Sequence, residues 1–380
     1  MNLFAKKIGI VGGGQLGKMM ILEAKRLGLW VAVLDPSATC CSASICDELI
    51  VAPLDDKAAY LSLAERVDVV TYEWENISAA ALEQLDKPVY PSVDSLKIIQ
   101  SKLLQKQTLR NGGVPVPDFT AVHSLEEIAR AGEQFGYPLV LKTLGGGYDG
   151  HGVAVAKDAN AVQTAYEKLG AGAKPLMAEE FVRYKKEISV IATRGIDGSR
   201  VIYPVAENHH ENSILDTTIV PARISNEVAD RACEIADRVM EILQGVGTCC
   251  VEMFVTEDGQ VSVNEVAPRP HNSGHYTIEG CLANQFENHV RAVVGLPLGS
   301  TELRQPTVMV NLLGQSVGAA QLLDVEEAYL DPQVKVHFYG KPMIKKTGQK
   351  MGHITVIGDT MEDAIARAER ARNIVRVTGK

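Results

Sequence analysis

The first 72 residues alternate apolar strand patterns with an amphipathic helix pattern, and this alternation constrains the fold more than any other feature. The strand patterns cover residues 7–11, 29–34 and 67–71, and the helix pattern covers residues 15–27. Alternating strands and helices form a parallel, doubly wound sheet, in which ligands bind where the strands end. The sequence therefore predicts an α/β domain at the N-terminus.

Beyond residue 95 the sequence holds further helix and strand patterns, and we expect an α+β arrangement there. With 380 residues, the chain is too long for one ordinary core. We expect helices at 95–110, 229–243 and 360–375, and strands at 139–142, 176–179, 187–193, 248–255 and 260–266. A short β-rich segment is expected between Pro306 and about residue 357.

Charge and composition exclude several classes of protein. The net charge of −9 argues against a nucleic-acid partner, because phosphate backbones select basic surfaces. No apolar run in the sequence reaches the length needed to span a bilayer, and the one near the N-terminus is too short for a signal peptide. The seven cysteines form no CxxC pair, which favours reduced thiols. We therefore expect a cytoplasmic protein without a membrane partner.

Two acidic residues give the sharpest prediction about a site. Asp258-Gly259 lies between two apolar strand patterns and predicts a two-residue type I′ turn. In that hairpin Glu252 lies directly opposite Glu265, with Cβ atoms roughly 5 Å apart. Like charges so placed repel each other, and a hard divalent cation such as Mg²⁺ removes the repulsion. The alternative is a solvated pair on the surface.

A glycine-rich loop, residues 145–152, follows Lys142 at the end of a predicted strand. Consecutive glycines free backbone N–H groups to surround phosphate oxygens, and the lysine adds a point charge. The spacing does not fit GxxxxGK[ST], so this is not a Walker loop. Taken alone, the loop is either a hairpin turn or a phosphate cover. Together with the acidic hairpin it favours a nucleotide–magnesium site.

The segment EVAPRPHNSGHY places Arg269 shortly after Glu265. A guanidinium can donate two parallel hydrogen bonds to a planar anion, so Arg269 beside a metal-bound phosphate suits bicarbonate. The histidines of the segment are either general bases or ordinary loop residues, and for His275 the sequence favours a loop residue.

The N-terminal loop also matches the dinucleotide fingerprint GxGxxG, at Gly12, Gly14 and Gly17, with Asp35 in the place of the ribose-binding acid. This reading favours a nicotinamide-dependent oxidoreductase. No residue further along the chain supplies a recognisable hydride-transfer site. A glycine loop at a helix N-terminus binds anions of many kinds.

The motifs GGGQLGKMM, YEWENI, GGYDGHG, VPARI, NEVAPRPHNSGHY and KMGH together resemble the N5-carboxyaminoimidazole ribonucleotide synthetase family of the ATP-grasp superfamily, over essentially the whole chain. The resemblance implies a pre-ATP-grasp doubly wound domain (1–94), a two-lobed ATP-grasp domain (95–300, with its small lobe at about 115–185) and a small C-terminal β domain (301–380), as a homodimer. It implies that ATP phosphorylates bicarbonate and that the amine of 5-aminoimidazole ribonucleotide captures the carboxyl group, leaving ADP and phosphate.

The resemblance also implies roles for individual residues. ATP would contact Lys102, Lys142, Gly147, Tyr148, Asp149, Gly150, His151, Gly152, Val153, Glu179, Glu180, Phe181, Val182, Glu187, His210, Asn264 and Glu265. The ribonucleotide and bicarbonate would contact Gly13, Gln15, Leu16, Glu73, Tyr148, Asp149, Arg269, Ser273, Lys346 and Lys350. Glu252 and Glu265 would bind Mg²⁺, and Lys142 and Arg269 would act in catalysis.

The chain departs from the related patterns at three positions. Ala267 stands where many ATP-grasp enzymes have asparagine, although the resembled family shares this feature. Gln349 stands where an arginine often precedes the MGH motif, and Lys102 replaces a common arginine, keeping its charge without its fork. The alternatives are another ATP-grasp ribonucleotide ligase, a formate-dependent transferase or a non-catalytic nucleotide sensor.

Overall fold

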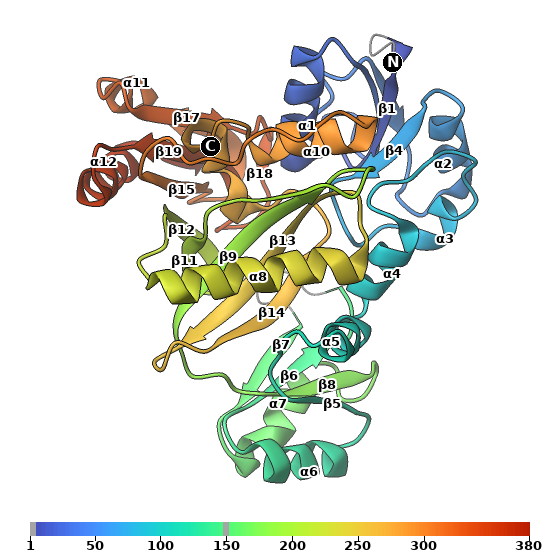
Figure 1. Ribbon diagram of the computed structural model, residues 1–380, viewed down its shortest axis with the longest axis vertical. Helices are drawn as coiled ribbons and strands as arrows, with labels where there is room; N and C mark the ends of the chain where they lie inside the picture. Colours follow the sequence, from blue (N-terminus) through green and yellow to red (C-terminus); the bar gives the residue numbers. More distant parts are fainter. Residues whose placement is uncertain (1–4, 147–151) are drawn as a thin grey trace.

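The N-terminal sheet is parallel, and its strand order is β3-β2-β1-β4. The computed structural model, shown in Figure 1, describes residues 5–146 and 152–380. The elements of this first part are β1 (Lys7–Val11), α1 (Gln15–Arg26), β2 (Trp30–Asp35), β3 (Glu48–Val51), α2 (Lys57–Ala64) and β4 (Val69–Tyr72). The sequence analysis missed β3, because this edge strand has four residues and none of them is fully buried.

Two helices replace the single helix predicted at 95–110. After α3 (Ala79–Leu82) come α4 (Val93–Gln100) and α5 (Lys102–Asn111). Ser101 has extended backbone angles, and its hydroxyl accepts a hydrogen bond from the N–H of Leu104. The serine therefore ends one helix and caps the next. The break places Lys102 in the first turn of α5, where its N–H donates to the Leu144 carbonyl at 2.7 Å.

A four-stranded antiparallel sheet with strand order β5-β8-β6-β7 forms a separate lobe, at the bottom of Figure 1. Its elements are β5 (Phe119–Val122), α6 (Leu125–Phe135), β6 (Leu139–Thr143), β7 (Val153–Ala156), η2 (Ala159–Ala161), α7 (Val162–Lys168) and β8 (Leu176–Glu180). Helices α6 and α7 share an apolar core with these strands. The predicted glycine loop joins β6 to β7, and its residues 147–151 lie outside the described residues.

The largest sheet has the order β14-β13-β9-β11-β12-β15-β19-β17, and β10 pairs with β9. Its elements up to residue 267 are β9 (Tyr184–Arg194), β10 (Arg200–Ile202), β11 (Ala206–Glu211), β12 (Ile214–Val220), α8 (Asn226–Leu243), β13 (Gly247–Thr256) and β14 (Val261–Ala267). Helix α8 lies across β9 and β13 in Figure 1 and buries its apolar face against them, with Ile235, Val239 and Met240 at most 2% exposed.

The C-terminal strands continue this sheet, since β12 pairs with β15 in the register Thr217↔Val310. The remaining elements are β15 (Thr307–Leu313), β16 (Gly318–Leu323), α11 (Val325–Ala328), β17 (Val334–Phe338), β18 (Met343–Ile344), β19 (Lys350–Ile357), α12 (Met361–Ile374) and β20 (Arg376–Gly379). Strands β18, β16 and β20 form a small sheet of their own. Helix α12, the predicted closing helix, packs on β15 and β19.

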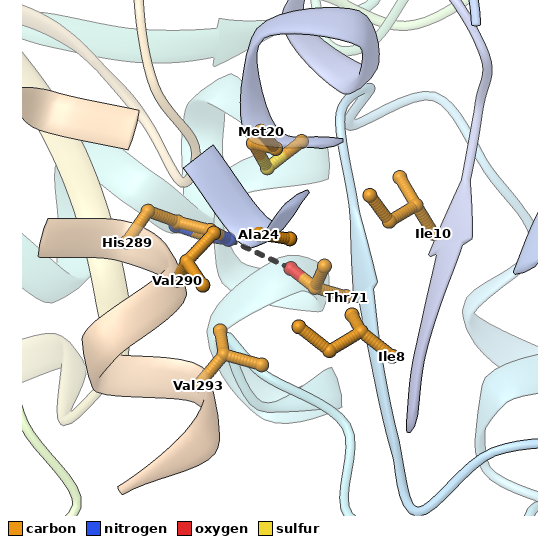
Figure 2. Close-up of a pocket in the computed structure, with 8 residues that line it drawn as sticks. All are labelled: Ile8, Ile10, Met20, Ala24, Thr71, His289, Val290 and Val293. Carbon is orange, nitrogen blue, oxygen red and sulfur yellow. Dashed lines mark hydrogen bonds between the residues drawn. The ribbon is translucent and has the colours of Figure 1, made fainter. Parts of the chain in front are cut away.

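A histidine connects the N-terminal sheet to the central one. The connecting elements are η3 (Asn272–Gly274), α9 (Thr277–Gly280) and α10 (Gln285–Val294), and α10 packs against α1. His289 Nδ1 accepts from the Thr248 N–H at 3.1 Å, so Nε2 carries the proton and lies 2.9 Å from Thr71 Oγ1 (Figure 2). Burial lowers the pKa of His289 to about 3, and the apolar side chains around it leave no space for a water molecule.

No helix among the described residues is long and apolar enough to cross a membrane.

Candidate active site

Glu252 and Glu265 are direct cross-strand partners on the β13–β14 hairpin, as predicted. The turn differs from the prediction, however. A type I′ turn needs a positive φ at both central residues, whereas at Asp258-Gly259 only the glycine has one, 80°. The N–H of Gly259 donates to the Thr256 carbonyl at 3.1 Å, and the Asp258 carboxylate accepts from the Thr256 hydroxyl. The loop therefore holds the three residues 257–259 rather than two.

A bulge in β14 restores the predicted pairing. Near the turn, Met253 pairs with Val263, one residue out of step with a two-residue turn. Asn264 is then the extra residue on its strand, and beyond it Glu252 faces Glu265. A slip of one residue without the bulge would have turned one glutamate to the other face of the sheet. The prediction of the pair is confirmed, but the turn type from which it was derived is wrong.

The two carboxylates have different electrostatic surroundings. Burial, together with the charge of Glu265, raises the pKa of Glu252. Burial would also raise the pKa of Glu265, but the ammonium groups of Lys102, Lys142 and Lys106 hold it below its ordinary value. Lys102 forms a direct ion pair with Glu265. The repulsion between the acids is thus concentrated at Glu252, where a divalent cation would relieve it.

In residues 5–146 and 152–380, no three His, Cys, Asp or Glu side chains gather into a cluster that could hold a metal ion. Two facing carboxylates do not form a complete protein cage. Magnesium in nucleotide-binding enzymes is usually held by one or two carboxylates together with substrate phosphates and water. The pair fits that second kind of site.

Lys142 lies at the end of β6 and is 9% exposed. Its ammonium group donates to Glu179 Oε1 at 2.7 Å and to Asn264 Oδ1 at 3.1 Å. The sequence analysis missed Lys106, whose Nζ lies 2.9 Å from the other oxygen of Glu179. The spacing of Lys102 and Lys106 on α5 is the signal that could have found it, because residues four apart share a helix face.

Glu187 and His210 lie on neighbouring strands, with 2.8 Å between Oε2 and Nδ1. Burial opposes both charges, but the pairing still lowers the pKa of Glu187 and raises that of His210. Both side chains also act electrostatically on Glu252. These two predicted nucleotide contacts are therefore close to the acidic pair.

The predicted adenine segment, residues 179–182, leads from β8 into β9 and so crosses between the two lobes. Phe181 is exposed, and the Glu180 carboxylate accepts a hydrogen bond from the backbone N–H of Asp118. Across the small lobe, Lys142 pairs with Val153, and the Thr143 N–H donates to the Gly152 carbonyl at 2.9 Å. The predicted contacts Gly147, Tyr148, Asp149, Gly150 and His151 lie outside the described residues.

Arg269 is bound by an acidic residue of the N-terminal part. Its Nε and Nη2 atoms donate to the two oxygens of Glu75, the latter at 3.2 Å. Nη1 donates to the Pro270 carbonyl at 3.2 Å. The fork predicted to bind bicarbonate thus holds a carboxylate, a planar anion of similar shape.

Ser273 is fully buried, and its hydroxyl contacts Ser189 at 2.8 Å and His271 Nδ1 at 2.9 Å. The hydroxyl of this predicted substrate contact thus has partners within the protein. Ser273 fixes the ring of His271, whose Nε2 lies 3.7 Å from Glu252. His275 is 1% exposed, and its ring packs against that of His353 with 4.6 Å between the ring centres, so its environment is structural, in line with the sequence analysis.

The N-terminal glycine loop already holds carboxylates of the protein. The N–H groups of Gly14 and Gly17 donate to Glu73, the latter at 2.7 Å, and the N–H of Gly13 donates to Asp35 at 2.7 Å. The loop therefore binds anionic groups, as its place at a helix N-terminus favours, but these groups are side chains of the protein itself. Two acids at the ends of β2 and β4 point to the helix N-terminus because its positive dipole end favours them.

This arrangement also bears on the dinucleotide interpretation. Asp35 accepts from the Ser37 N–H at 2.8 Å as well, so it caps a turn and binds the glycine loop rather than standing free for a ribose. Gln15 begins α1 and is partly exposed. The side chain of Leu16, by contrast, is 7% exposed and belongs to the apolar core.

Comparison with known proteins matches three regions of the chain to three kinds of domain. A ribonucleotide synthetase pre-ATP-grasp domain matches residues 5–100, an ATP-grasp domain matches 107–286, and a phosphoribosylaminoimidazole carboxylase C-terminal domain matches 307–367. The N5-carboxyaminoimidazole ribonucleotide synthase of Bacillus subtilis (strain 168) is 44% identical over 350 residues, which cover 92% of this chain and 90% of the relative. The chain belongs to the N5-carboxyaminoimidazole ribonucleotide synthase family.

Solved structures of this family have the same fold. The synthetase from Thermotoga maritima shares 43% identity with a TM-score of 0.90, covering 99% of this chain and all of the other. The Aspergillus clavatus synthase in complex with ADP and 5-aminoimidazole ribonucleotide shares 35% identity with a TM-score of 0.90, covering 98% and 99%. Family membership and the predicted fold class, with pre-ATP-grasp, ATP-grasp and C-terminal parts, are thus confirmed.

In this member of the N5-carboxyaminoimidazole ribonucleotide synthase family, one of the C-terminal basic residues lies close to the acidic pair. Lys350 begins β19 and acts electrostatically on Glu252, His210 and His271, so it lies near the centre of the site. Lys346 is exposed. Gln349, the departure from the family pattern, accepts from the Lys345 N–H at 2.7 Å and so folds back onto its own loop.

Proposed function

We propose that this chain carboxylates 5-aminoimidazole ribonucleotide with bicarbonate at the expense of ATP, giving N5-carboxyaminoimidazole ribonucleotide, ADP and phosphate in purine biosynthesis. The observation that carries the proposal is the facing pair Glu252–Glu265 with Lys102 and Lys142 around it, in a chain of this family. That arrangement provides oxygens for a cation and ammonium groups for phosphates.

The reaction has two steps. A bicarbonate oxygen attacks the terminal phosphorus of ATP, so that a P–O bond forms, the bond to ADP breaks and carboxyphosphate results. The amine of the ribonucleotide then attacks the carboxyl carbon, phosphate leaves, and the nitrogen loses a proton. Carboxyphosphate is unstable in water, so the site must close around it.

Glu252 and Glu265 would hold Mg²⁺, because both offer hard oxygens on one face of the hairpin. The ion would neutralise the charge that develops on the phosphates. Lys102 and Lys142 would bind the phosphate oxygens next to it. Glu187 with His210 would bind the ribose, and residues 179–182 would line the adenine at the crossing between the lobes.

Arg269 would orient bicarbonate through its fork. The Glu75 carboxylate bound by this fork supports the proposal, because it is a planar anion too, and Glu75 would share Arg269 with the bound bicarbonate. The ribonucleotide would lie near Gln15 and Glu73, with Lys346 and Lys350 reaching its phosphate. We also propose that the protein is a cytoplasmic homodimer. Sedimentation velocity would measure the mass of the assembly.

The first test measures ADP release from ATP and Mg²⁺, with bicarbonate and 5-aminoimidazole ribonucleotide supplied singly and together. We expect ADP formation to rise sharply only when both are present. Bicarbonate is needed to form carboxyphosphate, and the amine of the ribonucleotide is needed to convert it to product. Equal stimulation by formate with glycinamide ribonucleotide would instead support a formate-dependent transferase. Omitting bicarbonate from degassed buffer is the control.

A second prediction concerns Glu73→Gln. Gly14 and Gly17 donate to different oxygens of Glu73, and in glutamine one of these oxygens becomes an NH2 group that cannot accept, so the glycine loop should relax. We expect the KM for aminoimidazole ribonucleotide to rise roughly tenfold, the equivalent of about 1.4 kcal/mol, with the KM for ATP nearly unchanged. Glu48→Gln on β3, away from the loop, is the matched control. A similar rise in both KM values would contradict the assignment.

A further inference from the structure

Lys106 is a charged side chain in the apolar interior next to the acidic hairpin. It lies on α5 and is 2% exposed. Its ammonium group donates to the Val263 carbonyl at 3.1 Å and lies 2.9 Å from Glu179 Oε2. A lysine is rarely buried to this degree unless it is paired, so its partners define its role.

Glu179 is shared between two lysines. Its Oε1 accepts from Lys142 at 2.7 Å, while its Oε2 faces Lys106. Lys142 has a second contact with Asn264, the bulge residue next to Glu265. Two buried ammonium groups thus neutralise one carboxylate, which is 2% exposed. Burial and the neighbouring Lys142 charge lower the pKa of Lys106 to about 8, although Glu179 opposes this shift.

We propose that Lys106 is a positioning residue for the nucleotide: it is the permanent counter-ion of Glu179, and it thereby frees Lys142 to exchange this carboxylate for a phosphate. The inference rests on the proposed function, in which Lys142 binds phosphate oxygens. Lys142 is 9% exposed and its ammonium group contacts Asn264 beside Glu265, whereas the ammonium group of Lys106 lies deeper, at the Val263 carbonyl and Glu179. The two lysines therefore divide the tasks of neutralising and binding.

The physical argument concerns the charge that remains when Lys142 turns to a phosphate. With Lys106 present, Glu179 keeps a partner at 2.9 Å. Without it, the movement would leave a buried carboxylate unpaired, which is strongly unfavourable. Lys142 would then stay on Glu179, and nucleotide affinity would fall.

The test uses Lys106→Met in the full-length chain, with binding of ADP and Mg²⁺ measured by calorimetry in the absence of the other substrates. We expect Kd for ADP to rise roughly tenfold or more. Adding Glu179→Gln keeps the shape of this residue of the proposed adenine segment but removes the charge that traps Lys142, so the double variant should bind ADP at least about fivefold more tightly than Lys106→Met alone. Lys25→Met is the matched control, since Lys25 also bonds one carboxylate and one carbonyl, far from the site.

A role in folding alone would lower the melting temperature of Lys106→Met without rescue by the second substitution. The proposal is overturned if Lys106→Met binds ADP like the parent, or if Glu179→Gln fails to restore binding in a folded double variant. Should Lys106→Met not fold, Lys106→Gln, which can still donate to the Val263 carbonyl, takes its place. If the parent chain itself does not bind ADP, the proposed function fails together with this inference.

Discussion

Glu265→Gln is expected to lower kcat by about 10²- to 10³-fold, the loss typical of removing one preorganised electrostatic group from an active site. Glutamine keeps the shape of the side chain but offers a cation one neutral oxygen in place of a charged carboxylate. It also leaves Lys102 without its ion-pair partner. Glu252→Gln should have a similar effect on kcat, because Glu252 and Glu265 are direct cross-strand partners.

The comparison with a third glutamate of the same hairpin makes this test specific. Glu257 lies in the turn, with its side chain 77% exposed, and Glu257→Gln should keep near-parental turnover. Steady-state ADP release is measured over a range of magnesium concentrations for all three variants. Near-normal rates for Glu252→Gln and Glu265→Gln at low magnesium would refute the assignment of the acidic pair.

Glu207→Leu is expected to destabilise the fold by about 3 kcal/mol, the cost of breaking a buried ion pair. Glu207 is 1% exposed and lies 2.7 Å from Lys186 and 2.6 Å from Arg223, whose backbone N–H it also accepts at 3.0 Å. Leucine removes the acceptor that these donors share. Urea unfolding at neutral pH measures the loss, and Glu241→Leu, at an exposed pair on α8, should change stability by less than about 0.5 kcal/mol.

The same residue gives a pH dependence with a definite sign. Burial alone would raise the pKa of Glu207, but its hydrogen bonds from Arg223 and Lys186 lower it to about 2, against an ordinary value of 4.5. The stabilisation by the carboxylate is therefore fully present above pH 4.5 and is lost as the pH falls towards 2. The difference in stability between the parent and Glu207→Leu should narrow when unfolding is repeated at pH 4. A constant difference would show that packing, not charge, dominates.

Local patterns in the sequence predicted the elements well where the pattern was long. Strands β1, β6 and β13 and helices α1, α8 and α12 lie within a few residues of their expected positions. They failed where the decisive interaction was a single side chain. One hydroxyl, that of Ser101, divides a helix whose periodicity alone looks continuous. The four-residue strand β3 is too short for any period to emerge.

The candidate site shows a similar division. The acidic pair follows from two strands close in sequence, so a hairpin argument reaches it, although a three-residue turn and a bulge had to compensate each other. Contacts between distant segments had no local signal. Arg269 and Glu75 are 194 positions apart, and Gly14 and Glu73 are 59 apart. Only the folded chain shows that these groups bind each other, Arg269 to Glu75 and the Gly14 N–H to Glu73.

The pairing of β12 with β15 limits how chimeras could be made between this protein and its relatives. The matched regions 107–286 and 307–367 look like separate modules in sequence, yet their strands share main-chain hydrogen bonds from Thr217↔Val310 to Val220↔Thr307. Backbone pairing does not depend on which side chains the strands carry, so a chimera could tolerate many substitutions there. A single insertion or deletion between residues 221 and 306 that shifted this register would not be tolerated. It would move the buried side chains of the transplanted strand to the opposite face of the sheet. A chimera joined between these two regions must therefore keep the pairing register of β12 and β15, whereas the identities of the paired residues can vary.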